Sequence, residues 1–269
     1  MDKQHLLTSK QMAQFVADGY LRFDEIISDD LNRRAHSEMQ DRIPRAGAGT
    51  PFNQVWQDTA IGEVFRQPQI QGIIHSLVGP NPLYDHHAAH KVQANKDLGG
   101  HWHADAIIDT RQHFDIQFFY LPHDTPREMG GTMILPGSHF RHISNTDIAR
   151  YQNLKGQLPI VCKAGTIVVV HHGIWHCAQP NQTDTMRFMF KLRLNPTVKQ
   201  YRLWNTDDID DAQVRRNLGK NHGWYGNESR IETVIRGKFW RFLTGDGNFD
   251  SNYYLSRFEN QPEILTHAI

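Results

Sequence analysis

Three side chains of this chain together are typical of an iron site: His103, Asp105 and His176. His103 and Asp105 form a His-x-Asp pair, and Arg187 follows His176 by eleven positions. Two imidazoles and one carboxylate occupy one face of an iron ion and leave the opposite positions open for a bidentate co-substrate and dioxygen. A buried arginine nearby can hold the far carboxylate of that co-substrate through a two-pronged, charge-assisted contact. The set therefore predicts a non-haem Fe(II) oxygenase.

The spacing of the three residues decides which elements must carry them. On an extended strand, residues i and i+2 point to the same side, so His103 and Asp105 can reach one metal ion. We expect His176 to arrive from a second strand or turn, after the apolar run Thr166–His171. An isolated His-x-Asp pair is weak evidence in a chain with 17 histidines, so the prediction depends on the residues that accompany it.

Residues 1–80 predict a helical N-terminal part. Thr8 and Gln11 form a capping-box pattern, apolar residues follow at helical spacing, and Gly19 can end the helix. A second helix is expected after Ser28, and a third begins near Pro68 and stops at Gly79-Pro80.

Residues 83–196 predict a jelly-roll core, because short apolar runs alternate there with glycine and proline turns. The candidate strands are Asp115–Leu121, Thr132–Leu135, Pro159–Cys162, Thr166–Val170 and Met186–Leu194. The last of them alternates, with Arg187, Met189, Lys191 and Arg193 on one face. A charged strand face needs solvent or a polar cavity, and Arg187 favours the cavity. The predicted fold is therefore mainly β with flanking helices, a cupin-like double-stranded β-helix.

Residues 197–269 predict a C-terminal extension that packs on this core within one domain, 1–269. An amphipathic helix is expected there, and its apolar residues are Ile231, Val234, Ile235, Phe239 and Phe242. The sequence leaves the oligomeric state open.

The composition limits the class of protein. Lys plus Arg and Asp plus Glu are 29 each, so neither a nucleic-acid footprint nor a polybasic membrane surface is expected. No apolar run is long enough for a membrane span, and the N-terminus lacks the regions of a signal peptide. Cys162 and Cys177 are too few for a disulfide framework. We therefore expect a cytoplasmic protein.

The segment from His176 to Arg187 resembles a known family. The phytanoyl-CoA dioxygenase-like family of Fe(II)- and 2-oxoglutarate-dependent oxygenases has a distal block that reads His-x-Ser-x-x-Asn-x-Ser/Thr-x-x-x-Arg. His176, Asn181, Thr183 and Arg187 fall in register with it, whereas Ala178 stands where the family often has serine.

Three further blocks extend this resemblance over roughly residues 6 to 196. They are the N-terminal segment from Leu7 to Leu21, the proximal Trp102-His103-x-Asp105, and Gly130–His139, which is similar to the family's Gly…Pro-Gly-Ser-His turn. Four separate blocks in the same order make a specific signal. The presence of Asp105 argues against halogenation, because the similar halogenases have a small residue there.

The resemblance implies a reaction and its co-substrates. Fe(II) would bind His103, Asp105 and His176, and 2-oxoglutarate and dioxygen would take the open positions. Arg187 would pair with the distal carboxylate of 2-oxoglutarate, helped by Thr132 or Gln117. The expected outcome is oxidation of a small organic molecule, most simply its hydroxylation, with release of succinate and CO2. Desaturation, epimerisation and ring formation use the same iron site, and the sequence does not choose among these outcomes.

The resemblance also indicates a substrate side of the pocket. Lys91 stands where the family often has a lysine, and Ala104 stands where it often has glutamine, which opens room. Trp102 flanks a predicted metal ligand, and Arg193 lies on the face of the last strand that carries Arg187. Lys91, Lys191, Arg193 and Arg141 would form a cationic pocket for an acidic substrate only if they point inward.

Two other functions fit parts of the pattern. The string His101-x-His103-x-Asp105 overlaps the motif of binuclear metal-dependent hydrolases, but position 106 is Ala where that motif has its last histidine. A non-catalytic ligand-binding barrel is the third hypothesis. The complete set of His103, Asp105, His176 and Arg187 speaks against it, because a barrel without chemistry does not need these residues.

Overall fold

Two antiparallel sheets lie at the centre of the computed structural model, which describes residues 2–41, 50–105, 113–141 and 143–250. The major sheet has the strand order β1-β6-β3-β8-β2, and the minor sheet has the order β5-β4-β7. The strands are β1 (Tyr20–Phe23), β2 (Leu83–Val92), β3 (Ile116–Leu121), β4 (Met133–Leu135), β5 (Leu158–Pro159), β6 (Thr166–His171), β7 (Trp175–Cys177) and β8 (Arg187–Asn195). This arrangement confirms the predicted double-stranded β-helix.

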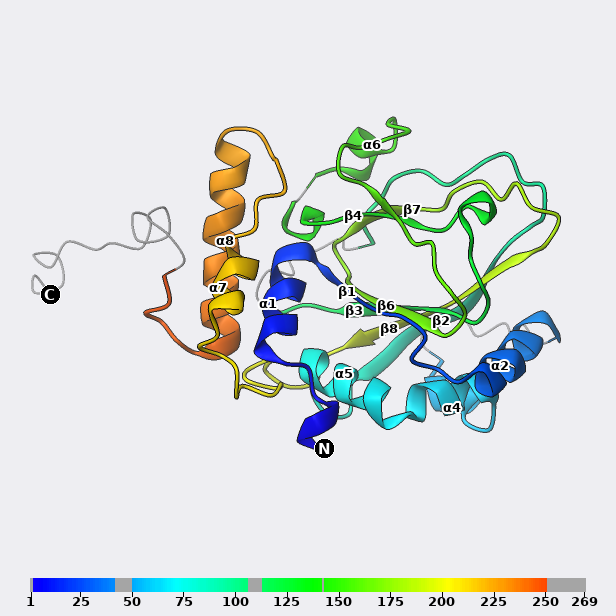
Figure 1. The fold of residues 1–269 in the computed structure, drawn as a ribbon, viewed down its shortest axis with the longest axis horizontal. Helices are drawn as coiled ribbons and strands as arrows, with labels where there is room; N and C mark the ends of the chain where they lie inside the picture. Colours follow the sequence, from blue (N-terminus) through cyan, green and yellow to red (C-terminus); the bar gives the residue numbers. More distant parts are fainter. Residues whose placement is uncertain (1, 42–49, 106–112, 142, 251–269) are drawn as a thin grey trace, which may run out of the picture.

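Helices cover the face of the major sheet that points away from the minor sheet (Figure 1). The α-helices are α1 (Ser9–Asp18), α2 (Asp29–Asp41), α3 (Phe52–Trp56), α4 (Ala60–Arg66), α5 (Pro68–Val78), α6 (Asn145–Ile148), α7 (Ala212–Leu218) and α8 (Asn227–Thr244). Short 3-10 helices are η1 (Lys3–His5), η2 (Arg127–Met129) and η3 (Ser138–Phe140). None of the helices in these described ranges combines the length and the apolar character that a bilayer span requires.

Local sequence signals explain where α1 begins and ends. The Thr8 side chain accepts from the Gln11 backbone N–H, and the Gln11 side chain accepts from the Thr8 backbone N–H. Gly19 then adopts the left-handed conformation with φ of 76°, which an L side chain rarely adopts, and its N–H donates to Phe15. Both ends of the predicted helix are confirmed.

Successive side chains of β8 point alternately into two different hydrophobic cores. Phe188, Phe190, Leu192 and Leu194 point into a core that the major sheet shares with the helices. On the opposite face, Met189 packs against a smaller core between the two sheets, which contains Phe119 and Val168 of the major sheet and Ile134 of the minor sheet. The charged residues of β8 therefore point into the space between the sheets.

Three parts of the chain differ from the expectations. Residues 1–80 are not purely helical, because Tyr20–Phe23 forms β1 and pairs with β6 at the edge of the major sheet. The strand expected at Pro159–Cys162 is the short β5, Leu158–Pro159. Ile231 is exposed although α8 forms as predicted.

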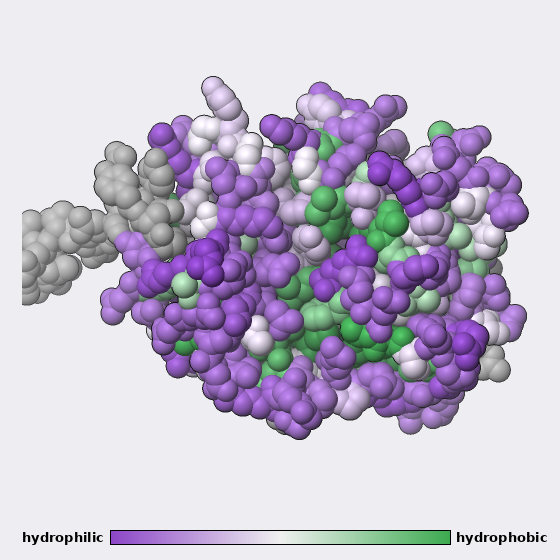
Figure 2. Space-filling view, in the orientation of Figure 1, coloured by the Kyte–Doolittle hydropathy of each residue, from purple (hydrophilic) through white to green (hydrophobic). Residues whose placement is uncertain are grey.

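The C-terminal extension packs on the core through α8. Phe239 of this helix stacks edge-on against Phe114 and Phe140, with ring centroids 5.3 and 5.5 Å away. Residues 251–269 of the extension lie outside the described residues, and the single-domain organisation remains a prediction. Figure 2 shows apolar residues gathered in the middle of one face, among a mainly hydrophilic surface.

Candidate metal centre

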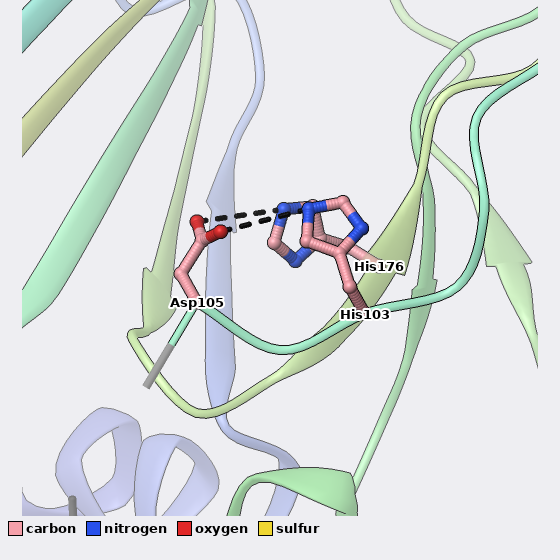
Figure 3. Close-up of side chains that lie close together, drawn as sticks. All are labelled: His103, Asp105 and His176. Atoms are coloured by element: carbon pink, nitrogen blue, oxygen red, sulfur yellow. Dashed lines mark ion pairs between the residues drawn. The ribbon is translucent and has the colours of Figure 1, made fainter. Parts of the chain in front are cut away.

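His103, Asp105 and His176 meet between the two sheets. One ligand atom from each residue lies within 4.8 Å of the other two, and they form a group with metal-binding potential in the described part of the chain. The Asp105 carboxylate lies 3.5 Å from Nε2 of His103 and 3.6 Å from Nε2 of His176. Figure 3 shows both imidazoles facing this carboxylate. These distances leave room for one ion among the three ligand atoms.

Backbone pairing fixes the two histidines relative to each other. The His103 N–H donates to the His176 carbonyl at 3.1 Å, and the His176 N–H donates to the His103 carbonyl at 2.9 Å. His176 belongs to β7, but His103 forms an isolated bridge and not the regular strand that its spacing suggested. Directly opposed residues in an antiparallel pair point to the same face, and the two rings accordingly lie 4.3 Å apart.

The tautomers of both histidines suit a metal ion. Nδ1 of His103 lies 2.8 Å from the His101 carbonyl, and Nδ1 of His176 lies 3.1 Å from the Ile174 carbonyl. A carbonyl oxygen only accepts, so each Nδ1 carries the hydrogen and each Nε2 presents a lone pair toward Asp105. A backbone carbonyl on the second nitrogen is the usual support of a ligating histidine. The donor set therefore fits a divalent iron ion.

Charges around the centre keep its groups in ligating form. Burial alone would raise the pKa of Asp105. That pKa nevertheless lies well below its usual range, because His176 and Lys191 lie nearby and because Lys191 and Gln117 donate hydrogen bonds to the carboxylate. Burial lowers the pKa of His176 to about 4, although the Asp105 carboxylate opposes this. At neutral pH the carboxylate is therefore ionised and the His176 imidazole is neutral, as metal binding requires.

Arg187 is buried at the start of β8, with 5% of its surface exposed. Nη1 donates to the Met129 carbonyl at 3.0 Å, and the guanidinium forms no ion pair with any carboxylate that the structure describes. Burial lowers its pKa to about 10, so the group stays charged at neutral pH. A buried cation that lacks a carboxylate partner favours an anionic ligand at this position.

Asn181 and Thr183 organise the loop that separates His176 from Arg187. The fully buried Asn181 amide donates to the carbonyl groups of Gln93 and Thr185, at 3.1 and 2.8 Å. Its Oδ1 accepts from both the N–H and the hydroxyl of Thr183. These two motif residues therefore shape the turn that returns the chain to β8, and they do not contact the metal group directly.

The Gly130 turn packs on the same loop. Gly130 has φ of 67°, and a Cβ atom there would lie 1.6 Å from the Pro180 carbonyl. Only glycine therefore fits this position without displacing the loop. The neighbouring Met129 carbonyl is the acceptor for Arg187, so the turn also fixes the guanidinium.

Several predicted residues lie along the space between the two sheets. Gln117 donates from Nε2 to Oδ2 of Asp105 at 2.7 Å. Thr132 is buried, and its hydroxyl lies 3.8 Å from the sulfur of Met189, which shares the strand face of Arg187. Arg193 pairs with Asp115 at 2.6 Å on that face.

Two predicted substrate residues are not brought to the centre. Lys91 is exposed and pairs in register with Phe188, so it lies on the helix-covered face of the sheet. Trp102 is buried in an apolar cluster with Leu135, Trp175 and Cys177.

Three residues beside the metal group support its ligands without binding the metal themselves: His101, Ala104 and Asn145. The exposed His101 contributes its carbonyl to His103, and its ring does not belong to the metal group. Asn145 was not predicted from the sequence. Its side chain accepts from the Ala104 N–H at 3.0 Å and donates to the Ala104 carbonyl at 3.1 Å, and so it holds the residue between two ligands. Its separation of 41 residues from Ala104 explains why no local pattern revealed it.

Solved structures share this fold at low sequence identity. A structure of EvdMO1 is 19% identical, with a TM-score of 0.55 over 70% of this chain and 50% of EvdMO1. The present chain therefore spans half the length of EvdMO1. EctD from S. alaskensis, solved with 2-oxoglutarate and 5-hydroxyectoine, is 17% identical, with a TM-score of 0.56 over 72% and 77% of the two chains. HygX from Streptomyces hygroscopicus, solved with iron, is 13% identical, with a TM-score of 0.57 over 78% and 94%.

Sequence comparison gives the family. No curated protein matches the chain. The sequence model of the phytanoyl-CoA dioxygenase (PhyH) family matches residues 9–189, a range that contains all three residues of the metal group and Arg187. The chain therefore belongs to the phytanoyl-CoA dioxygenase family and is a non-haem oxygenase that depends on iron and 2-oxoglutarate.

Proposed function

We propose that His103, Asp105 and His176 bind the Fe(II) ion, that Arg187 binds 2-oxoglutarate, and that the enzyme hydroxylates a small organic molecule. The observation that carries this proposal is the convergence of the three ligand atoms within 4.8 Å, with both Nε2 lone pairs directed at the same point. The hydrolase hypothesis has less support, because the His101 ring lies outside this group and the family is one of oxygenases.

The chemistry of the bound iron is that of its family. When bound, iron would supply an oxidation in which 2-oxoglutarate and dioxygen convert a C–H bond to C–OH, with the second oxygen atom going to succinate and CO2 released. The protein contributes ligands and orientation. Arg187 holds the distal carboxylate of 2-oxoglutarate, and its burial strengthens the charge-assisted contact because little water competes for the guanidinium.

Thr132 and Gln117 complete the proposed co-substrate site. The Thr132 hydroxyl lies beside the strand face that carries Arg187, where it can donate to an oxygen of 2-oxoglutarate. The Gln117 amide has two hydrogens, of which one is used by Asp105. The second hydrogen is available to the co-substrate.

Arg193 and Ala104 are the proposed substrate contacts. Arg193 pairs with Asp115 on the inner face of β8, and Ala104 lies between two proposed iron ligands, where its small side chain packs against the apolar cluster that contains Trp102. A small organic molecule bound there would present a carbon atom to the open side of the iron. We place the enzyme in the cytoplasm as part of this proposal, because both of its cysteines, Cys162 and Cys177, are free and buried thiols.

The first experiment is an anaerobic titration of the protein with Fe(II) and 2-oxoglutarate. We expect the weak visible charge-transfer band of the chelate, and we expect Asp105→Ala to lose both the band and succinate formation. Asp124→Ala is the matched control, because Asp124 is an exposed aspartate paired with Lys163 outside the site. Undiminished succinate formation by Asp105→Ala would contradict the ligand assignment.

A second variant tests the co-substrate site. Arg187→Leu should weaken 2-oxoglutarate binding by about 10² to 10³-fold, because truncating one partner of a buried charge pair costs about 3–5 kcal/mol, of which the retained iron chelate offsets part. Arg22→Leu is the control, since Arg22 also donates to a backbone carbonyl but lies at the exposed edge strand β1. An unchanged affinity for 2-oxoglutarate would remove the role that we give to Arg187.

A further inference from the structure

Asp105 uses its two carboxylate oxygens differently. Oδ2 accepts from Nζ of Lys191 at 2.6 Å and from Nε2 of Gln117 at 2.7 Å. Among the described residues, Oδ1 accepts no hydrogen bond and lies 3.5 Å from Nε2 of His103. Oδ2 also lies 3.6 Å from Nε2 of His176, so each oxygen faces one of the two imidazoles, and Oδ1 is the one whose lone pairs the described part of the protein leaves unused.

The two donors reach Asp105 from neighbouring strands. Phe119 of β3 pairs with Lys191 of β8, and Gln117 pairs with Arg193. Gln117 and Lys191 are therefore diagonal neighbours on one sheet face, roughly 7–8 Å apart at the backbone, and long side chains from such positions can meet at one atom. Their common target is Oδ2 of Asp105.

Asp105 needs this support more than the two histidines do. His103 and His176 are fixed by reciprocal backbone hydrogen bonds, whereas Asp105 belongs to no strand or bridge. The contacts from Lys191 and Gln117 are the ones that tie its carboxylate to the major sheet. The Lys191 side chain is 13% exposed, so water competes weakly for its ammonium group.

We infer that Lys191, with Gln117, is a positioning residue that holds Asp105 as a one-oxygen ligand of the iron. This inference rests on the proposed assignment of His103, Asp105 and His176 as the ligands. A carboxylate held in this way takes one coordination position and leaves the adjacent ones to 2-oxoglutarate and dioxygen. Lys191 acts through Asp105 and touches neither the co-substrate nor the substrate in this role.

Two effects of Lys191 on metal binding have opposite signs. Its positive charge repels a divalent ion, so its removal by charge alone would tighten metal binding. Its hydrogen bond orients the ligand, and loss of such a support typically weakens metal affinity by about 10–100-fold. We infer that the orienting hydrogen bond has the larger effect, so removal of Lys191 should weaken metal binding. Tighter binding after its removal would show that charge repulsion is the larger effect.

The test measures the affinity of anaerobic protein for Fe(II), and for Co(II) as a spectroscopic probe, by calorimetry. We expect Lys191→Met to weaken both affinities by about 10–100-fold and Lys191→Arg to restore them to within a few-fold of the native protein. Lys163→Met is the matched control, because it removes a lysine from an aspartate pair with Asp124 at 2.7 Å outside the site. It should bind both metals like the native protein.

The visible spectrum of bound Co(II) separates positioning from a purely structural role. A carboxylate that changes from one-oxygen to two-oxygen ligation alters the coordination number and therefore the band, whereas a general loss of stability does not. Gln117→Leu provides the same test if Lys191→Met does not fold. Equal or tighter metal binding by Lys191→Met, with an unchanged spectrum, would overturn the inference. Absence of metal binding in the native protein would instead overturn the proposed ligand set itself.

Discussion

A buried charge cluster joins the C-terminal extension to α1, and it makes a prediction about pH. Asp18, at the end of α1, accepts from Nζ of Lys220 at 2.7 Å and from Nε2 of His222 at 2.9 Å. Nδ1 of His222 lies 2.9 Å from Oε1 of Glu232 on α8, and Arg236 donates to the same oxygen at 2.8 Å. Both nitrogens of His222 thus face carboxylates, so the folded protein favours the doubly protonated imidazole.

The pKa of His222 fixes the sign of the prediction. Burial alone would lower this pKa, but the hydrogen bonds to Asp18 and Glu232 raise it above its ordinary value. A group whose pKa is raised on folding stabilises the folded state fully below its unfolded pKa of about 6.5. That contribution to the free energy of unfolding is lost as the pH rises through the folded pKa.

The size of the effect follows from the two contacts. The His222 side chain is 7% exposed, and a hydrogen bond to a charged group contributes about 1.5–3 kcal/mol against about 0.5–1.5 kcal/mol for a neutral one. His222→Gln keeps one neutral donor and loses the charge. We expect this variant to be less stable than the native protein by about 2–3 kcal/mol near pH 6, and we expect this difference to shrink as the pH rises through the folded pKa of His222.

Urea unfolding of both proteins near this pH and at higher pH values gives the required differences. Comparing variant with native protein cancels the other histidines, among which His139 and His172 have pKa values lowered by burial and therefore destabilise the fold as the pH falls. A gap between native protein and His222→Gln that stays constant or grows toward high pH would refute the reasoning.

Three further substitutions test the supports of the site. Gly130→Ala should destabilise the fold by about 3 kcal/mol in urea unfolding, because its Cβ would meet the Pro180 carbonyl at 1.6 Å and its φ is 67°. Asn145→Ala should weaken Fe(II) affinity about 10-fold in calorimetry, since it removes both hydrogen bonds to Ala104, and it should hardly change stability because Asn145 is exposed. Asn181→Ala should cost about 3 kcal/mol in urea unfolding, because it leaves buried carbonyl groups without a donor.

Local signals were enough to predict the elements that build the site. The capping pair at Thr8 and the left-handed Gly19 define α1, and strict alternation identifies β8 with Arg187 on its inner face. These features depend on residues within a few positions of each other, where backbone geometry leaves few choices. The approach of His176 to the His103–Asp105 pair was inferred from the pattern of residue types, and the structure brings the three together.

Register was harder to predict than the presence of strands. The pairing of β2 with β8 shifts between Tyr84 and His86, and a shift of one residue exchanges the two faces of a strand. Lys91 consequently lies on the face of Phe188, away from the space between the sheets. The sequence alone shows the alternation of each strand but not the irregularity that decides which side is inner.

Contacts between residues far apart in the sequence could not be predicted at all. The strand Tyr20–Phe23 follows α1 after one residue, and only its pairing with β6 across the sheet makes it a strand. Asn145 meets Ala104 across 41 residues, and Lys191 meets Asp105 across 86. None of these contacts has a spacing that a helix or strand period would reveal.

The two halves of the proposed iron site depend on different parts of the fold. His103 and His176 are held by backbone hydrogen bonds on the side of the minor sheet, which side-chain substitutions do not remove. Asp105 is held by side chains from the major sheet. Substitutions on the inner face of β3 and β8 should therefore alter the carboxylate and leave the histidine pair in place. Such substitutions should thus change the affinity for the metal and the coordination by Asp105 while the fold of the protein is kept.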